Sequence, residues 1–102
     1  MKIAYFGGDW YMDCLDVFIR HGHSISHIFI CNEHSFNQKI RIYAKQHHIP
    51  VTACKASRKA IERAEEDGID CIFSAEYSWL IPINNTGLKS INMHPTLLPH
   101  GR

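Results

Sequence analysis

The chain has 102 residues, which is enough for one small domain. Apolar residues make up 45% of them, so a buried core can form, and the formal net charge of +1 excludes the strong basic field typical of nucleic-acid-binding domains. No apolar run approaches the roughly 20 residues that cross a bilayer, and no signal peptide is visible. The four cysteines form no C-x-x-C pair, which indicates free thiols. We therefore expect a cytoplasmic protein.

Short apolar runs alternate with stretches of helical periodicity along the chain. The expected strands are Lys2–Phe6, His23–Cys31, Val51–Cys54, Ile69–Ser74 and Ser90–Met93. The expected helices between them are Trp10–His21, Phe36–His48 and Arg58–Asp67. Strands separated by helices pair in parallel, so the pattern predicts an α/β fold with a doubly wound, Rossmann-like parallel sheet.

Helix-capping residues mark several of these boundaries. Asp9 is placed to cap the first helix and Ser57 the third, because short polar side chains accept the unpaired amides of a first turn. Gly22 and Gly68 follow the same two helices and predict their ends. The inner faces are expected to carry Tyr11, Cys14, Leu15, Phe18 and Ile19 in the first helix and Ala60, Ile61 and Ala64 in the third. In the second helix, the residues at helical spacing are Ile40, Tyr43, Ala44 and His47.

Ligands of doubly wound sheets bind beyond the carboxyl ends of the strands. Three segments are expected there: Gly7–Trp10, Ser74–Ile81 and Asn92–Pro99. In the last of these, Asn92 and His94 stand two residues apart at a strand end, so their side chains share one face. An amide N–H can stabilise an oxyanion, and an imidazole can move a proton near neutral pH. This pairing suits attack of an amine on a carbonyl, although a purely structural role fits the same two residues.

The run Asn92–Pro99, within INMHPTLLPHGR, resembles the N-x-H-x-S-L-L-P motif of the folate-dependent formyltransferases. Thr96 stands where the motif has serine and keeps its hydroxyl. The segment IFSAEYSWLI is similar to the segment that lines the family's folate pocket, and YFGGDWYMDCLDVFIRHGHSI to its opening strand, turn and helix. The Gly7-Gly8 turn departs from the G-x-G-S-N pattern of the purine-pathway branch and is closer to the branches that act on amino-sugar nucleotides or methionyl-tRNA.

The resemblance implies formyl transfer from 10-formyltetrahydrofolate to an amine, with Asn92 and His94 as catalytic residues. The family's third catalytic residue, an aspartate, would lie beyond residue 102. We therefore expect residues 1–102 to be the N-terminal portion of a single catalytic domain that is inactive without the remainder.

Further site residues follow from the same resemblance. It assigns folate contacts to Tyr77, Ser78, Trp79, Leu80 and Ile81, and substrate contacts to Gly8, Asp9, Thr96, Leu97 and Pro99. Two of these segments have simpler interpretations. The apolar residues of 77–81 could close the end of the sheet, and Gly7-Gly8-Asp9 could be only a tight turn from strand to helix. Glu76 fits either contact with an amine or a solvated position.

The acceptor and the partners are left as hypotheses. The balanced charge favours a small amine, most simply an amino-sugar nucleotide, over methionyl-tRNA, and hydrolysis of the donor by water uses the same motif. A folate- or nucleotide-binding domain without turnover is the alternative outside the enzymes. We expect no metal cofactor, since the histidines at positions 21, 23, 27, 47 and 48 lack a zinc-ligand spacing and favour a solvated surface. An uncovered sheet edge would favour a homodimer.

Overall fold

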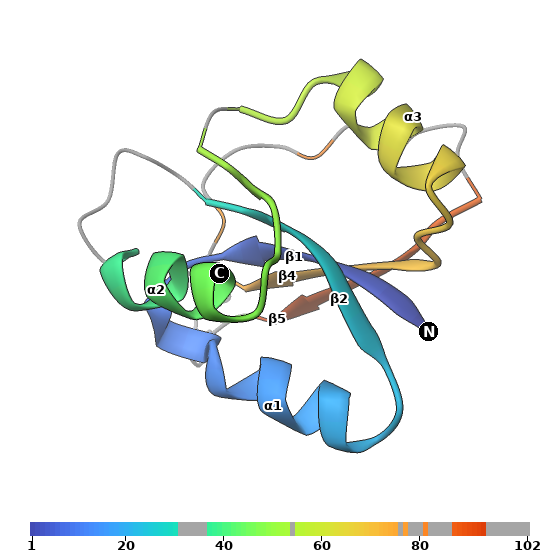
Figure 1. Cartoon of the computed structure of the whole chain (residues 1–102). Helices are drawn as coiled ribbons and strands as arrows, with labels where there is room; N and C mark the ends of the chain where they lie inside the picture. Colours follow the sequence, from blue (N-terminus) through green and yellow to red (C-terminus); the bar gives the residue numbers. More distant parts are fainter. Residues whose placement is uncertain (31–36, 54, 76, 78–80, 82–86, 94–102) are drawn as a thin grey trace, which may run out of the picture.

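The computed structural model describes residues 1–30, 37–53, 55–75, 77, 81 and 87–93. It contains a five-stranded parallel sheet in the order β3-β2-β1-β4-β5, with helices on both faces (Figure 1). The strands are β1 Lys2–Gly7, β2 Ser24–Phe29, β3 Val51–Thr52, β4 Cys71–Ala75 and β5 Lys89–Met93. The helices are the 3₁₀ turn η1 Asp9–Tyr11, α1 Asp13–Arg20, α2 Gln38–Gln46 and α3 Arg58–Glu66. The predicted α/β class and Rossmann-like parallel sheet are confirmed.

The two faces of the sheet are covered by different helices. Figure 1 shows α1 and α2 together on one face and α3 on the other. The central strands β1 and β4 are buried on both faces because helices cover both sides of the parallel sheet and successive side chains point to opposite layers. The core on the α1 and α2 side contains Ile3, Tyr5, Leu15, Ile25, Ile28, Ile30, Ile40, Tyr43, Ala44, Cys71, Phe73 and Ala75. The core on the α3 side contains Ala4, Phe6, Phe29, Ala56, Ile61, Ile69 and Ile72.

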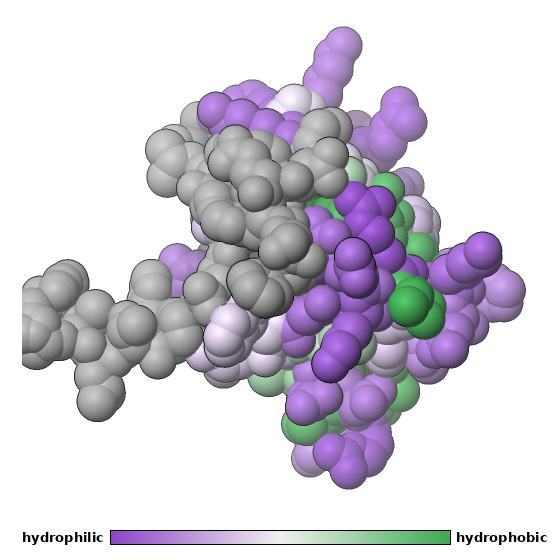
Figure 2. Space-filling model, turned by 90° about the vertical axis from the view of Figure 1, so that its left-hand side faces the viewer, coloured by the Kyte–Doolittle hydropathy of each residue, from purple (hydrophilic) through white to green (hydrophobic). Residues whose placement is uncertain are grey.

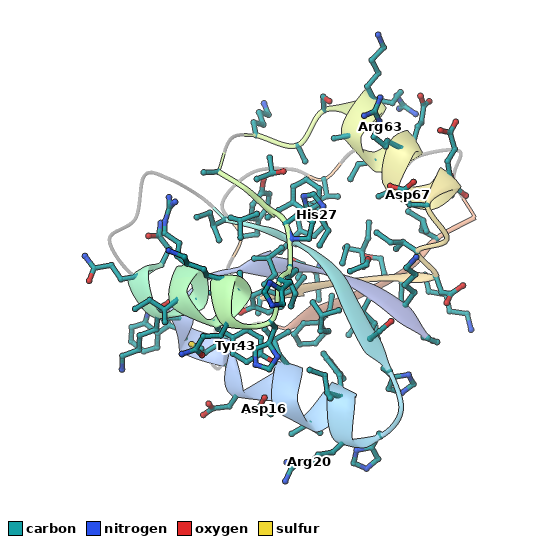
Figure 3. All side chains as sticks on the ribbon, viewed as in Figure 1. Asp16, Arg20, His27, Tyr43, Arg63 and Asp67 are labelled. Atoms are coloured by element: carbon teal, nitrogen blue, oxygen red, sulfur yellow. The ribbon has the colours of Figure 1, made fainter. Side chains whose placement is uncertain are left out.

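The pairing of β1 with β2 contains a register shift that changes which side chains face α3. Ile3 pairs with Ile25, but the next residue, Ala4, pairs with His27, so Ser26 is an extra residue in β2. An extra residue reverses the alternation of the residues that follow it. As a result His27 lies on the α3 side, where its ring packs 4.5 Å from the ring of Phe29 (Figure 3).

Most of the expected helix signals are confirmed. The hydroxyl of Ser57 accepts the amide of Ala60 at 3.1 Å and caps α3. Gly22 and Gly68 adopt φ values of 88° and 98°, and this left-handed conformation ends α1 and α3. Leu15, Ile40 and Ile61 are fully buried on the inner faces of the three helices, as the periodicity predicted.

Four details of the sequence analysis are wrong. The first helix does not start at Trp10, because the 3₁₀ turn η1 precedes α1. Asp9 does not cap this helix, since neither η1 nor α1 has a side-chain cap. Ile19 is 41% exposed and therefore lies off the buried face of α1. His27 is half-buried instead of solvated, because the register shift turns it into the α3 layer.

The sheet ends in β3 on one side and β5 on the other. The described side chains of β5, from Lys89 to Asn92, are all exposed, which fits the position of an edge strand. Within the described residues, none of the helices is both long enough and apolar enough to cross a membrane.

Candidate functional site

The centre of the candidate site is the carboxyl end of β1 and β4. The chain leaves β1 toward β2 and β3 on one side, and β4 and β5 lie on the other side. The order of the strands therefore reverses between β1 and β4, which is where ligands of doubly wound sheets bind. Gly7 of β1 pairs with Ala75 of β4 at this point. Figure 2 views the molecule from the side to which the strands' carboxyl ends point, and its described surface is mainly hydrophilic with isolated apolar residues.

Gly7 is required by a close approach of two backbones. A Cβ atom on Gly7 would lie 2.5 Å from the carbonyl oxygen of Ala75 and 2.9 Å from the hydroxyl oxygen of Tyr5. That hydroxyl donates a hydrogen bond of 2.8 Å to the carbonyl of Gly8, the first predicted substrate contact. The turn after β1 is thus held by a buried side chain and leaves no room for a side chain at Gly7.

Asp9 has a different structural role from the predicted one. Its Oδ1 accepts the backbone N–H of Ile40 at 2.7 Å, and its Oδ2 accepts the backbone N–H of Lys39 at 3.1 Å. These amides belong to the first turn of α2, so Asp9 caps α2 instead of the helix that follows it. Each carboxylate oxygen can accept a further bond, so the arrangement leaves acceptor capacity for a substrate.

Trp10 belongs to a segment expected at the ligand-binding end of the sheet, but no ligand contact was predicted for it. Trp10 lies in η1 directly after Asp9 and is 65% exposed, whereas its neighbours Tyr11 and Met12 pack against the core. The signal that could have found it is the position of a large aromatic residue immediately after a glycine turn at a strand's carboxyl end.

Asn92 lies at the carboxyl end of β5 and is exposed. It pairs in register with Ser74 of β4, which in turn pairs with Phe6 of β1. Asn92 is therefore on the α3 side of the sheet and two strand spacings from β1, which corresponds to roughly 10 Å. The other predicted residues of this motif, His94, Thr96, Leu97 and Pro99, lie outside the described residues.

Tyr77 and Ile81 are the described residues of the predicted folate segment. Both are half-buried and pack against the core on the α3 side. The ring of Tyr77 meets the ring of Phe6 edge-on, with 5.0 Å between centroids. This packing fits both interpretations of the segment, so the folate contact stays a prediction. Glu76, Ser78, Trp79 and Leu80 lie outside the described residues.

A second group of polar side chains lines a hollow at the opposite, amino-terminal end of the sheet. It has a volume of about 340 Å³ and is lined by Lys2, Ser26, His27, Pro50, Ala64, Asp67 and Ile69. The imidazole of His27 is 2.8 Å from the hydroxyl of Thr52, and burial lowers the pKa of this histidine despite the opposing effect of the Asp67 carboxylate (Figure 3). The ammonium of Lys2 donates to the carbonyl of Asp67 at 2.6 Å.

The thiols and the acidic groups of the described chain supply no obvious nucleophile or metal centre. Burial raises the pKa of Cys71 and of Cys14, and the carboxylate of Asp13 raises that of Cys14 further, so both thiols are protonated at neutral pH. Within the ranges described above, no three His, Cys, Asp or Glu side chains are grouped so that they could hold a metal ion.

Comparison with known proteins adds no assignment. None of the models of known protein families matches the chain, and no curated protein matches it. The resemblance to the formyltransferases accordingly rests on the chain's own motifs.

Proposed function

We propose that the protein transfers a formyl group from 10-formyltetrahydrofolate to the amine of an amino-sugar nucleotide. The observation that carries the proposal is the position of Asn92. An exposed amide at the carboxyl end of β5 lies one strand from the point where the strand order reverses and roughly 10 Å from Phe6 of β1. The motif that resembles the formyltransferases therefore begins beside the crevice where a ligand of this fold would bind.

The proposed reaction is addition followed by elimination at the formyl carbon. The acceptor amine forms a bond to that carbon and the carbonyl oxygen becomes an oxyanion, to which the amide N–H of Asn92 donates a hydrogen bond. His94 takes the proton that the attached amine must lose. The bond from the formyl carbon to N10 of the folate then breaks, and the proton passes to N10 of the tetrahydrofolate that leaves.

The choice of acceptor rests on charge. The chain carries a net charge of +1, and such a balance supports a small acceptor better than a tRNA, which binds through basic surface. Methionyl-tRNA and water are the competing acceptors, because attack by either requires the same oxyanion donor and the same proton transfer.

The proposal is tested by a formyl-transfer assay on the full-length protein. Mass spectrometry should detect N-formylated UDP- or TDP-linked amino sugars. It should detect neither formylmethionyl-tRNA nor the formate that transfer to water would release. Asn92→Ala should lower kcat by about a hundredfold, as expected for the loss of an oxyanion donor. The matched control is Ser90→Ala, which removes an exposed polar side chain from the same face of β5, two residues before Asn92, and should leave kcat unchanged.

Binding of the formyl donor distinguishes a folate-binding protein from a domain that is unrelated to folate. A saturating concentration of 5-formyltetrahydrofolate, about 100 times its Kd, should raise the Tm of the chain by about 10 °C or more. A raised Tm without formyl transfer by the full-length protein would leave the non-catalytic binding domain as the function. An unchanged Tm would contradict both.

A further inference from the structure

Trp10 is the most exposed of the large apolar side chains found on the described surface. Its exposed fraction is 65%, compared with 59% for Ile42 on α2 and 49% for Ile91 on β5. Unlike those two, it lies at the carboxyl end of the central strand β1, where the strand order reverses. A large aromatic surface exposed at the ligand-binding end of a sheet is more informative than an exposed aliphatic residue elsewhere.

The backbone on both sides of Trp10 is held by contacts to the core and to α2. Before it, the Gly8 carbonyl accepts the Tyr5 hydroxyl at 2.8 Å, and the Asp9 carboxylate accepts the two amides of α2. After it, Tyr11 and Met12 pack against the core on the α1 and α2 side. The turn is therefore pre-organised. A ligand that binds to the exposed indole does not have to order the turn as well.

An indole that is 65% exposed suits a flat heteroaromatic ring. Stacking of a nucleobase on an aromatic side chain is favourable for every base, because each base has a π face. A cation for the phosphates is close in the fold, since Lys39 is exposed and its backbone amide is 3.1 Å from Asp9. Phe6, near the end of β1, and Asn92 are two strand spacings apart, roughly 10 Å, which is a span that a diphosphate and a sugar can bridge.

We propose that Trp10 stacks on the nucleobase of a nucleoside diphosphate and that Asp9 is the positioning residue that holds Trp10 in place. The inference rests on the proposed function in one respect, which is that the nucleotide carries the amine acceptor. Asp9 acts through the turn and through α2, not by touching the base.

The test is ¹⁹F NMR of the chain labelled with 5-fluorotryptophan. The sequence has two tryptophans, so two signals are expected, and the variant Trp10→Tyr assigns them. UDP should shift the signal of Trp10. Ribose 5-phosphate and pyrophosphate, which lack the ring, should leave it unchanged. A Trp10 signal that does not respond to UDP, or that responds equally to the two ligands without a ring, would overturn the proposal.

Variants measure how much the ring contributes. Trp10→Ala should raise the Kd for UDP about tenfold, whereas Trp10→Tyr, which keeps an aromatic face, should raise it less than threefold. The matched control is Ile19→Ala, which removes an exposed apolar side chain from the far end of α1. An equal Kd for Trp10→Ala and the unmodified chain would contradict the stacking role.

The positioning role of Asp9 needs a control of similar effect on stability. Asp9→Ala should raise the Kd for UDP as much as Trp10→Ala, and Asp9→Asn, which keeps one acceptor oxygen, should restore part of the affinity. Tyr43→Phe removes a hydrogen bond between α2 and α1 at the Asp16 carboxylate and should leave the Kd unchanged. If Tyr43→Phe weakened UDP binding as much as Asp9→Ala, the effect would be one of stability and the positioning role would be wrong.

The same labelled chain separates this inference from the proposed function. 5-Formyltetrahydrofolate should shift the other signal, that of Trp79, which the sequence resemblance assigns to the folate segment. A UDP response at Trp10 without a folate response at Trp79 would support the stacking site and contradict the formyltransferase. A folate response with no UDP response would do the reverse.

Discussion

The carboxylate of Asp9 accepts the backbone N–H of Ile40 at 2.7 Å, across 31 positions of sequence. The bond joins the turn after β1 to the first turn of α2, and both flank the carboxyl end of the sheet. Asp9, which belongs to a predicted ligand-binding segment, thus stabilises the neighbouring helix α2. This contribution to stability can be measured without any ligand.

Asp9→Ala should lower the free energy of unfolding by about 1–2 kcal/mol, because two amides of α2 lose their acceptor. Urea unfolding followed by circular dichroism measures the change. Glu62→Ala, at an exposed position of α3, is the control and should change the stability by less than about 0.5 kcal/mol. Equal stability of the two variants would show that the cap contributes nothing.

Gly7→Ala should destabilise the protein by about 1–3 kcal/mol, because the new methyl group would overlap the Ala75 carbonyl and force β1 and β4 apart. Gly87→Ala provides the comparison, since its Cβ would be 3.5 Å from the nearest atom, Glu65 Oε2, which is ordinary contact. Thermal unfolding of the two variants should differ clearly in Tm. A Gly7→Ala protein as stable as Gly87→Ala would contradict the close approach of the two strands.

His27 should make the protein less stable in weak acid. Burial lowers its pKa in the folded state below the ordinary 6.5, so the unfolded chain binds more protons as the pH falls through that value. The stabilising contribution is present above pH 6.5 and is lost progressively as the pH falls toward the lowered pKa. Urea unfolding at pH 7.5 and pH 5.5 should show a larger loss for the unmodified chain than for His27→Gln. Equal losses would mean that the pKa of His27 is not lowered in the folded protein.

Tyr43 should ionise at a higher pH than an ordinary tyrosine. Burial, followed by the charge and the hydrogen bond of Asp16, raises its pKa to about 12 (Figure 3). Because the folded pKa is raised, the stabilising contribution is complete below pH 10 and is lost as the pH rises from 10 to 12. Tyr43→Phe should remove a titration step near pH 12 from the absorbance at 295 nm and cost about 1 kcal/mol at pH 7. Loss of a step near pH 10 instead would contradict the raised pKa.

The third helix shows how far local sequence signals determine structure. Ser57 caps it, Gly68 follows its end, and Ile61 is fully buried on its inner face, all as the sequence predicts. Each of these signals involves residues within one helix, and the energy that decides them is local. The same holds for Gly22 after α1. Of the candidate site, the sequence indicated the segments at the carboxyl ends but neither the partner of Asp9 nor the exposure of Trp10.

The sequence by itself determined the alternation of strands and helices, the parallel sheet and two of the helix ends, because periodicity, glycine and capping chemistry act over a few residues. Only the tertiary structure decided which helix Asp9 caps and which face His27 occupies. Asp9 could bond to the nearest helix or to one 31 positions away, and the packing of η1 against α2 selects the latter. His27 turns toward α3 because β2 accommodates an extra residue at Ser26 when it pairs with β1, and pairing register depends on two strands at once.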